Sequence, residues 1–273
     1  MATFFSKNDD KSEYSYLENS EMENNPIAIS VKGLSVSYER KRVLTNIHLE
    51  VEQGKVYGVI GPNGAGKSTL FKSVLGMIDT NTGQIEVLGG DVEEVRKKIA
   101  YVPQRDEVDW DFPATVEDIV LMGRYPHKKI LQRINKEDRR LAAEALADLG
   151  IEDLSKRQIG QLSGGQQQRV FIARALCQQA EIFFLDEPFV GVDMLTEEKI
   201  ITILHKLADE GKTLLVVHHD LSTVEDYFDK VILLNQRLIA YGDTKETFTQ
   251  SNIGKAYGAQ LTILHQTGGF TGN

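Results

Sequence analysis

The chain has 273 residues, 41% hydrophobic and 26% charged, a balance typical of one globular α/β domain with appended subdomains. Its 31 basic and 40 acidic residues give a net charge of −9 without a basic stripe, which argues against nucleic-acid binding. No apolar run approaches about 18 residues, so no transmembrane helix is expected. The single cysteine, Cys177, can form no disulfide within the chain, which is consistent with a reducing cytoplasm.

The first 25 residues differ from the rest of the chain. Residues 1–25 carry many acidic and few aliphatic side chains, which predicts a disordered acidic tail. No apolar segment follows a basic start, so we expect no secretory signal here. Asn25-Pro26 predicts a domain boundary. We therefore expect a folded domain over residues 26–242 and a C-terminal appendage of short helical and extended segments over 243–273.

The segment Gly61-Pro62-Asn63-Gly64-Ala65-Gly66-Lys67-Ser68 matches G-x-x-x-x-G-K-[ST] at every fixed position. Residues 55–60 before it predict a buried strand, and residues 68–75 after it predict a helix, which is the context that a phosphate-binding loop needs. Glycines let successive N–H groups point at phosphate oxygens, and the helix N-terminus adds a partial positive charge. We therefore expect ATP here, with Lys67 at its β- and γ-phosphates and the Ser68 hydroxyl on Mg²⁺.

A second glycine-rich helix start lies downstream. Residues 105–161 predict helices, one beginning at Thr115 and another running from Lys136 to Leu149. Leu162-Ser163-Gly164-Gly165-Gln166 follows, and Ser163 with Gln166 forms a capping-box pattern that predicts a helix through Leu176. The two glycines allow a phosphate to approach closely, yet the chain already has a phosphate loop. We interpret the segment as a site for a phosphate that arrives on another subunit.

An apolar run ending in two carboxylates comes next, Ile182-Phe183-Phe184-Leu185-Asp186-Glu187. Four consecutive apolar residues predict a central parallel strand that is buried on both faces. At its end, Asp186 is expected to hold the Mg²⁺ side of the site, and Glu187 to orient or deprotonate the attacking water. Taken alone, the same segment also fits a strand that runs into a solvated acidic turn.

Together these motifs resemble those of the nucleotide-binding subunit of an ATP-binding cassette (ABC) transporter, over residues from about Ile27 to Tyr241. The resemblance implies an α/β P-loop NTPase fold with a mostly parallel central sheet and an N-terminal antiparallel β subdomain. It also implies a helical subdomain, about residues 105–165, that carries the signature Leu162–Gln166. In such proteins two subunits pack head to tail, so that each signature covers the other subunit's γ-phosphate. The resemblance therefore implies an ATP hydrolase that works as a nucleotide-sandwich homodimer.

The resemblance also implies roles for single residues. Tyr38 matches the aromatic residue that stacks on adenine, Gln104 the Q-loop glutamine, Asp193 the D-loop aspartate at the dimer interface, and His219 the switch histidine. Expected catalytic residues are Glu187, His219 and Gln104, and expected Mg²⁺ ligands are Ser68, Gln104 and Asp186. The residues expected to bind the nucleotide are Tyr38, Gly61, Pro62, Asn63, Gly64, Ala65, Gly66, Lys67, Ser68, Thr69, Ser163, Gly164, Gly165, Gln166 and Asp193.

His218 stands where this family more often has threonine. A pair of adjacent histidines suggests a metal site, but consecutive residues of a strand point to opposite faces. We therefore interpret His218 as a structural residue.

The residues from Pro103 to Pro113, and those at 188–193 and 218–221, resemble the manganese/zinc/iron importer branch of the family. This resemblance implies uptake of a divalent transition metal, manganese in the first place and zinc or iron as alternatives. Its implied partners are integral membrane permease subunits and, indirectly, an extracytoplasmic metal-binding protein, with this chain on the cytoplasmic face of the plasma membrane. In such transporters, those partners select the metal. The alternative is a soluble non-transport ABC ATPase that acts with a cytoplasmic scaffold.

The only tryptophan lies just after Gln104, among four acidic residues. Family members receive a coupling helix of the permease at this place, and we expect Trp110 and Phe112 to line that groove. The acidic residues would then meet basic residues of the partner. The alternative is a solvated loop whose aromatic side chains pack inward.

Overall fold

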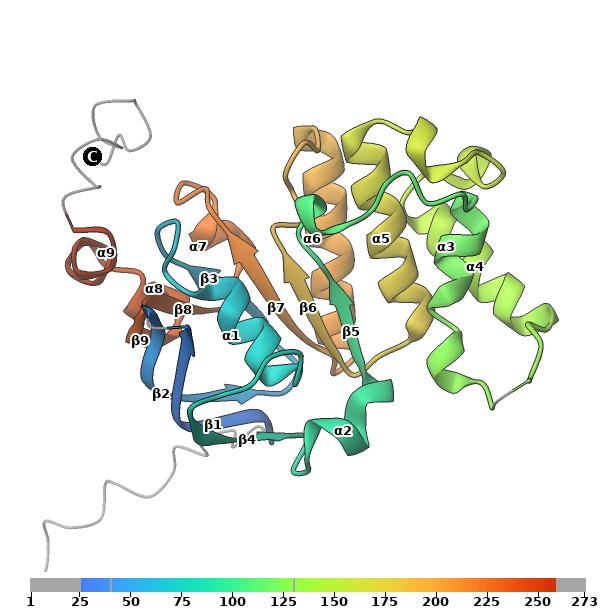
Figure 1. Ribbon diagram of the computed structural model, residues 1–273. Helices are drawn as coiled ribbons and strands as arrows, with labels where there is room; N and C mark the ends of the chain where they lie inside the picture. Colours follow the sequence, from blue (N-terminus) through green and yellow to red (C-terminus); the bar gives the residue numbers. More distant parts are fainter. Residues whose placement is uncertain (1–25, 40, 130, 259–273) are drawn as a thin grey trace, which may run out of the picture.

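The computed structural model describes residues 26–39, 41–129 and 131–258 (Figure 1). The predicted tail of residues 1–25 and the end of the predicted appendage, residues 259–273, lie outside this range. The strands are β1 (Ile27–Tyr38), β2 (Lys41–Glu52), β3 (Val56–Ile60), β4 (Thr82–Val87), β5 (Ile99–Val102), β6 (Ile182–Asp186), β7 (Thr213–His218), β8 (Lys230–Asn235) and β9 (Arg237–Asp243). The α-helices are α1 (Lys67–Val74), α2 (Val92–Val95), α3 (Val116–Met122), α4 (Lys136–Asp148), α5 (Gly164–Gln178), α6 (Met194–Asp209), α7 (Val224–Tyr227), α8 (Thr244–Thr247) and α9 (Gln250–Tyr257).

A six-stranded sheet in the order β5-β6-β7-β3-β8-β9 forms the centre of the molecule. Its first five strands run parallel, and β9 pairs antiparallel with β8. Every residue of β3, β6 and β7 is buried. The continuous apolar run at residues 182–185 thus marks a strand that is covered on both faces, as predicted.

Alternation along these strands divides the core into two layers. On one face, Phe183 and Leu185 of β6 join a cluster with residues of α3, α4, α5 and α6. On the other face, Ile182 and Phe184 join α1 and the small sheet described next. The Phe184 ring meets Phe71 of α1 edge to face, with 4.9 Å between the ring centroids. Because the period of a strand is two, one short apolar segment supplies both layers.

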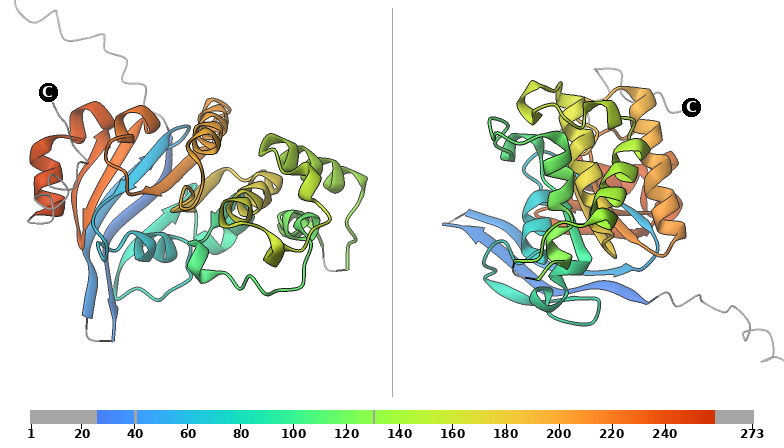
Figure 2. Two further views of the ribbon diagram at one scale, coloured as in Figure 1. Left: turned by 90° about the horizontal axis from the view of Figure 1, so that it is seen from above. Right: turned by 90° about the vertical axis from the view of Figure 1, so that its right-hand side faces the viewer.

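A separate antiparallel sheet in the order β2-β1-β4 packs on the α1 face. It forms the N-terminal β subdomain, and helices α3 and α4 lie at the other end of the molecule (Figures 1 and 2). Between these ends, α5 packs against α3, α4 and the edge strand β5.

Capping residues set the starts of the helices as predicted. Thr115 and Ser163 each accept a hydrogen bond from the backbone N–H three residues on, and the side chains of Asp118 and Gln166 complete the two capping boxes. Helix α4 begins at Lys136 after a third box, and ends one residue before the predicted Leu149. Among the described residues, no helix is both long enough and apolar enough to cross a membrane.

Parallel strands end on the same edge of a sheet, and this places the chemically distinctive residues together. The loop of residues 61–66 follows β3, Glu187 follows β6, and His219 follows β7. Gln104 lies two residues after β5. All four segments therefore meet at the carboxyl edge of β5, β6, β7 and β3.

Candidate functional site

A cavity of about 710 Å³ opens at this edge, and residues 63–69 form one of its walls. Gly64 and Gly66 adopt left-handed backbone conformations with φ of 78° and 97°. At Gly66 a side chain would also collide, since a Cβ there would lie 2.6 Å from Leu44 Cδ2. This glycine thus permits both the turn and the close packing of the loop on β2.

Lys67 is buried at the base of the loop, 6% exposed. Its Nζ donates hydrogen bonds to the carbonyl oxygens of Gly61 and Pro62, at 2.8 and 3.0 Å. Burial lowers the pKa of Lys67, while the nearby Glu187 and Asp186 act in the opposite direction. The ammonium group is therefore held in place by weak neutral acceptors that an anion could replace.

Asp186 is fully buried at the end of β6. Neither of its carboxylate oxygens has a hydrogen-bond partner among the described residues. Burial raises the pKa of Asp186, although the Ser68 hydroxyl lies near enough to lower it. A buried carboxylate without a partner costs free energy unless something binds it, and a carboxylate beside a hydroxyl is an oxygen site that Mg²⁺ prefers. The two residues fit a magnesium ion.

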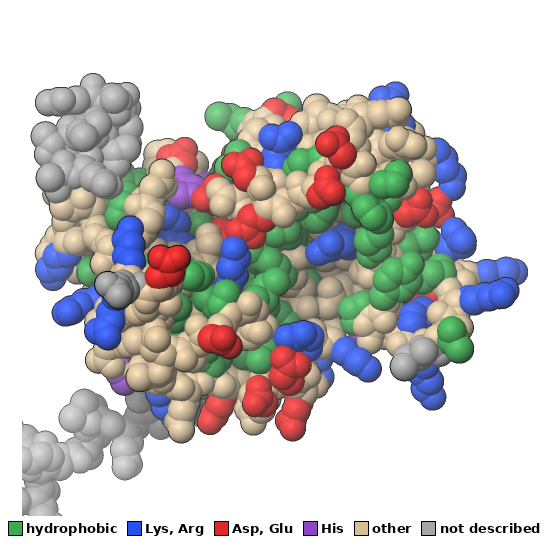
Figure 3. All heavy atoms as spheres, viewed as in Figure 1, with side chains coloured by type: hydrophobic (Ala, Val, Ile, Leu, Met, Phe, Trp, Pro, Cys, Tyr) green, Lys and Arg blue, Asp and Glu red, His purple; other side chains and the backbone are tan. Residues whose placement is uncertain are grey.

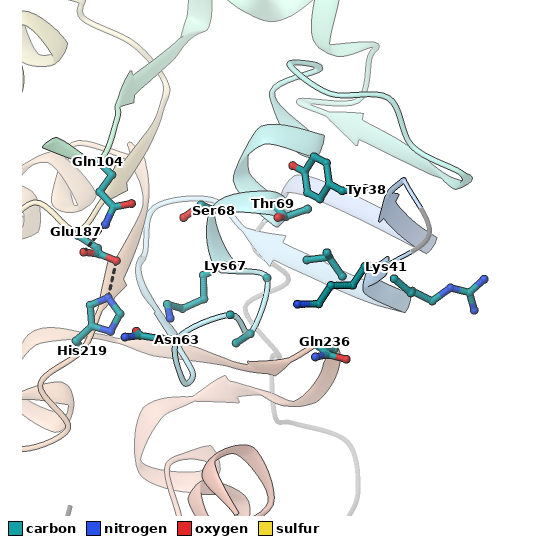
Figure 4. Close-up of a pocket in the computed structure, with 15 residues that line it drawn as sticks. Tyr38, Lys41, Asn63, Lys67, Ser68, Thr69, Gln104, Glu187, His219 and Gln236 are labelled. Atoms are coloured by element: carbon teal, nitrogen blue, oxygen red, sulfur yellow. Dashed lines mark hydrogen bonds and ion pairs between the residues drawn. The ribbon is translucent and has the colours of Figure 1, made fainter. Parts of the chain in front are cut away.

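Glu187 lies between two side chains from segments that follow different strands, Gln104 after β5 and His219 after β7 (Figure 4). Gln104 Nε2 donates to Glu187 Oε2 at 3.0 Å, and His219 Nε2 lies 2.7 Å from Glu187 Oε1. The backbone of Glu187 is left-handed, with φ of 53°, which is strained for a residue with a side chain. The three residues predicted to be catalytic therefore lie together on one side of the cavity.

Tyr38 lies on the opposite side of the cavity, at the end of β1, and is 46% exposed (Figure 4). An exposed ring beside an open cavity can offer its face to a planar ligand. Lys41 of β2 and Gln236, between β8 and β9, also line this part of the cavity. Neither residue is among those expected from the sequence. Gln236 reaches the site because its backbone N–H donates to Ala65 O at 2.8 Å, a contact between segments far apart in the chain.

The signature residues lie elsewhere. Of the predicted nucleotide contacts, Ser163, Gly164, Gly165, Gln166 and Asp193 do not line the cavity. Gly61 and Pro62 do not line it either, and their carbonyl oxygens accept hydrogen bonds from Lys67 instead. Ser163 and Asp193 are exposed, and the two segments approach each other, since a Cβ on Gly165 would lie 2.6 Å from Gly191 O. The structure thus gathers the P-loop, Q-loop and acidic residues into one site and leaves the signature outside it.

The adjacent histidines diverge. His218 lies among the rings of Phe189, Tyr227 and Phe228, and its Nε2 is 2.7 Å from Thr223 Oγ1. His219 instead lines the cavity at the sheet edge, where it contacts Glu187. This arrangement supports the interpretation of His218 as structural.

Beside the Q-loop lies a second cavity of about 370 Å³, which we call the Trp110 groove. Its lining is mostly apolar and comes from the loop around Trp110, from α3 and from α5, with the charged residues Glu107, Asp109 and Arg174 among it. Hydrophobic side chains gather on this part of the surface (Figure 3). The Trp110 ring packs on Phe171 edge to face, at 5.2 Å between centroids, while Phe112 is 51% exposed. Both side chains line this groove, and Trp110 also packs inward as the alternative had it. That the groove receives a coupling helix stays a prediction.

The four acidic residues beside the groove, Asp106, Glu107, Asp109 and Asp111, are all exposed. Glu107 also forms a surface ion pair with Lys72 of α1. That these side chains meet basic residues of a partner stays a prediction.

Comparisons with known proteins identify the family of this chain and several relatives. The family model described as ABC transporter matches residues 44–190. The manganese transport system ATP-binding protein MntB of Bacillus subtilis (strain 168) is 54% identical over 236 residues, which cover 86% of this chain and 94% of that protein. The zinc transport system ATP-binding protein TroB of Treponema pallidum (strain Nichols) is 48% identical over 235 residues, covering 86% of this chain and 88% of that protein.

Solved structures show the same architecture. CbiO1 from Clostridium perfringens, part of the ABC transporter complex cbiONQ, superposes with a TM-score of 0.69 and 26% sequence identity. The match covers 88% of this chain and 98% of that one.

Proposed function

Because this chain belongs to the ABC transporter family and is an ATPase of that family, we propose that it is the ATP-binding subunit of a metal importer. It hydrolyses ATP in a head-to-tail homodimer to drive uptake of a divalent transition metal, manganese in the first place. The observation that carries this proposal is the 54% identity to a manganese transport system ATP-binding protein over 86% of the chain. The similarity to a zinc transport protein, at 48%, keeps zinc as the second candidate metal.

In the proposed complex, ATP occupies the cavity at the sheet edge. Its phosphates meet the backbone N–H groups of residues 63–68, and the adenine lies against Tyr38 on the far side. Lys67 exchanges its bonds to two neutral carbonyls for stronger, charge-assisted bonds to phosphate oxygens. Ser68, Asp186 and Gln104 would hold Mg²⁺, which would supply positive charge beside the phosphates.

Glu187 is the proposed general base. Gln104 and His219 each hold one of its oxygens, so the carboxylate has one orientation before any water arrives. A water placed between Glu187 and the γ-phosphate gives its proton to the carboxylate as it attacks. His219, at the rim of the same cavity, is also placed to contact the γ-phosphate.

The signature supplies the rest of the site from the partner subunit. Ser163 and the free N–H groups at the start of α5 form an anion-binding end that is exposed and lies outside the chain's own ATP cavity. Asp193 is exposed at the start of α6, close to the signature. In a head-to-tail dimer, these groups complete the ATP site of the other subunit.

The Trp110 groove is the proposed docking place of the permease. Its apolar lining suits an apolar side of a short helix, and Asp106, Asp109 and Asp111 suit basic residues on that helix. This docking would hold the chain on the inner face of the plasma membrane and connect ATP hydrolysis to transport.

The proposal is tested by purifying the tagged chain from the cells that encode it and by measuring uptake. We expect an integral membrane permease to copurify, and deletion of the chain to abolish uptake of radioactive manganese. Expression of the wild-type chain should restore uptake, while the Lys67→Ala variant should not. Copurification of a soluble scaffold, or normal uptake of both manganese and zinc after deletion, would overturn the proposal.

A further inference from the structure

We propose that Arg105 is a positioning residue that ties the Trp110 groove to the signature helix, so that docking at the groove alters the site that this helix offers to the partner's ATP. The proposal rests on the function proposed above and adds to it a residue-level connection. Arg105 lines neither the ATP cavity nor the groove. It lies between them.

The guanidinium group of Arg105 contacts the first turn of α5. Its Nε and Nη2 both donate to Gln167 Oε1, at 3.3 and 3.2 Å. The same group lies beside Gly164, where a Cβ would be 3.3 Å from Arg105 Cζ. Arg105 therefore fixes the segment in which the signature glycines lie.

Gln167 is a rigid anchor for this contact. Its side chain is buried, 4% exposed, and its Nε2 donates to Ile159 O at 3.2 Å. Because the amide nitrogen is already bonded, the amide oxygen has one fixed direction, toward Arg105. A shift of Arg105 cannot be absorbed by rotation of Gln167 without the loss of a buried hydrogen bond.

Trp110 holds Arg105 from the side of the groove. Trp110 Nε1 donates to the backbone oxygen of Arg105 at 2.9 Å, and Arg105 Cζ lies 5.8 Å from the centre of the tryptophan ring. Trp110 is itself a wall of the groove and packs on Phe171 of α5. A ligand that displaces Trp110 therefore also displaces Arg105.

The other neighbour of Arg105 is the active site of its own chain. Gln104 precedes it and donates to Glu187. One peptide bond thus separates the contact to the signature from the contact to the proposed base. A movement of residues 104–110 reaches two ATP sites together, one in this subunit and one in the partner.

Charge strengthens the argument. The N-terminus of a helix carries a partial positive charge, so a cation beside it is unfavourable until an anion arrives. Arg105 is a cation at the N-terminal turn of α5. A phosphate bound at the signature would relieve this repulsion, which makes the position of Arg105 sensitive to ATP on the partner.

The test uses the complete transporter in lipid nanodiscs, with ATP hydrolysis measured for the free subunit and for the complex, with and without metal-loaded binding protein. Variants are Arg105→Ala, Gln167→Ala and the double variant. Arg139→Ala is the matched control. Arg139 of α4 forms a surface ion pair with Glu117 of α3, so this variant also removes an arginine contact of the helical subdomain.

We expect the free Arg105→Ala subunit to hydrolyse ATP within about threefold of wild type, and the stimulation in the complex to fall about five- to twentyfold. Gln167→Ala should give at least the same loss, because it also breaks the bond to Ile159 O, and the double variant should lose no more than Gln167→Ala alone, because the two changes share the Arg105 contact. Arg105→Lys keeps the charge but cannot place two donors on one oxygen, so it should rescue only part of the stimulation. A purely structural role would instead lower the melting temperature and both rates together.

Full stimulation in Arg105→Ala, or additive losses in the double variant, would overturn the inference while the proposed function stands. A wild-type complex that shows no stimulation would instead remove the proposed function itself. The two failures are therefore distinguishable.

Discussion

At the scale of single residues, Glu187 shows how the chain prepares its site. A left-handed residue with a side chain costs on the order of 1 kcal/mol, and it persists only where its surroundings hold it. Here two side chains, Gln104 and His219, hold the carboxylate. The side chain lines the cavity. The strain and the two hydrogen bonds together indicate a preorganised group.

His218 makes the stability of the fold depend on pH. Burial among aromatic rings lowers its pKa from 6.5 to about 4; the charge of Asp220 acts the other way, and His219 lowers it further. As the pH falls, His218 is therefore protonated at a higher pH in the unfolded chain than in the folded one. Stability from the neutral ring is present above about pH 6.5 and is lost toward pH 4, by on the order of 3 kcal/mol.

We predict that His218→Gln flattens this dependence, because glutamine does not ionise yet can still bond to the Thr223 hydroxyl. The measurement is urea unfolding at several pH values across the window, for wild type and variant. His48→Gln, at an exposed position on β2, should keep the wild-type slope. An unchanged slope in His218→Gln would show that another group is responsible.

At the scale of elements, the start of α5 is the part whose role depends most on a second subunit. We predict that Ser163→Arg keeps ATP binding, because Ser163 does not line the cavity, and lowers hydrolysis at least about a hundredfold. The arginine fills the space that the partner's γ-phosphate needs. Fluorescent-nucleotide titration and phosphate release measure the two properties.

Thr249→Arg provides the control for that experiment. Thr249 caps α9 as Ser163 caps α5, accepting from the backbone N–H three residues on. Its loss removes a helix cap far from the signature, at a cost of about 1 kcal/mol. Normal turnover by Ser163→Arg would mean that the signature does not complete another subunit's site.

The Trp110 groove gives a second prediction at this scale. Trp110→Ala should leave hydrolysis by the free subunit intact and reduce metal uptake several-fold, because it removes the wall of the proposed docking place. Metal uptake is measured in cells, and ATP hydrolysis is measured on the purified subunit. Tyr125→Ala, an exposed aromatic residue that does not line the groove, serves as the control. Unaffected transport in Trp110→Ala would rule out docking there.

Elements also show what a sequence can and cannot predict. Strands β3 and β6 follow from continuous apolar runs, and the start of α5 from its capping pair, because local residues dictate these features. The place of Gln236 in the cavity depends on a hydrogen bond to Ala65 across the fold, and no local pattern encodes it. The contact of Arg105 with Gln167 likewise joins residues 62 positions apart.

Lys41 lies between these cases. It is adjacent to a basic residue, Arg42, and follows Tyr38 by three positions, so a hairpin that brings both sides to the nucleotide could have been predicted. Two other features could not have been predicted, because the packing of other elements determines them. They are the exposure of the Tyr38 side chain and the hydrogen bond from Gln104 to Glu187.

At the scale of the whole molecule, ATP bound between two copies is expected to stabilise the dimer. We predict that Glu187→Gln binds ATP, hydrolyses it at least about a hundredfold more slowly, and accumulates as a dimer, because glutamine cannot accept the proton. Multi-angle light scattering with saturating MgATP measures the mass, and phosphate release measures the rate.

Glu198→Gln is the matched control, an exposed residue of α6 outside the cavity. It should hydrolyse ATP as the wild type does, and no dimer should build up. A Glu187→Gln variant that stays monomeric at saturating ATP would contradict the closed-dimer arrangement.

The exposed signature, set apart from the ATP cavity of its own chain, also has a genetic consequence. In the proposed dimer each site takes its P-loop from one copy and its signature from the other, so one defective copy damages a site that contains normal residues. With equal amounts of normal and Ser163→Arg chains pairing at random, only about a quarter of the dimers are free of the defect. A recessive outcome is expected for an enzyme whose active sites are complete in each chain. For this protein, a mutant allele should be partly dominant.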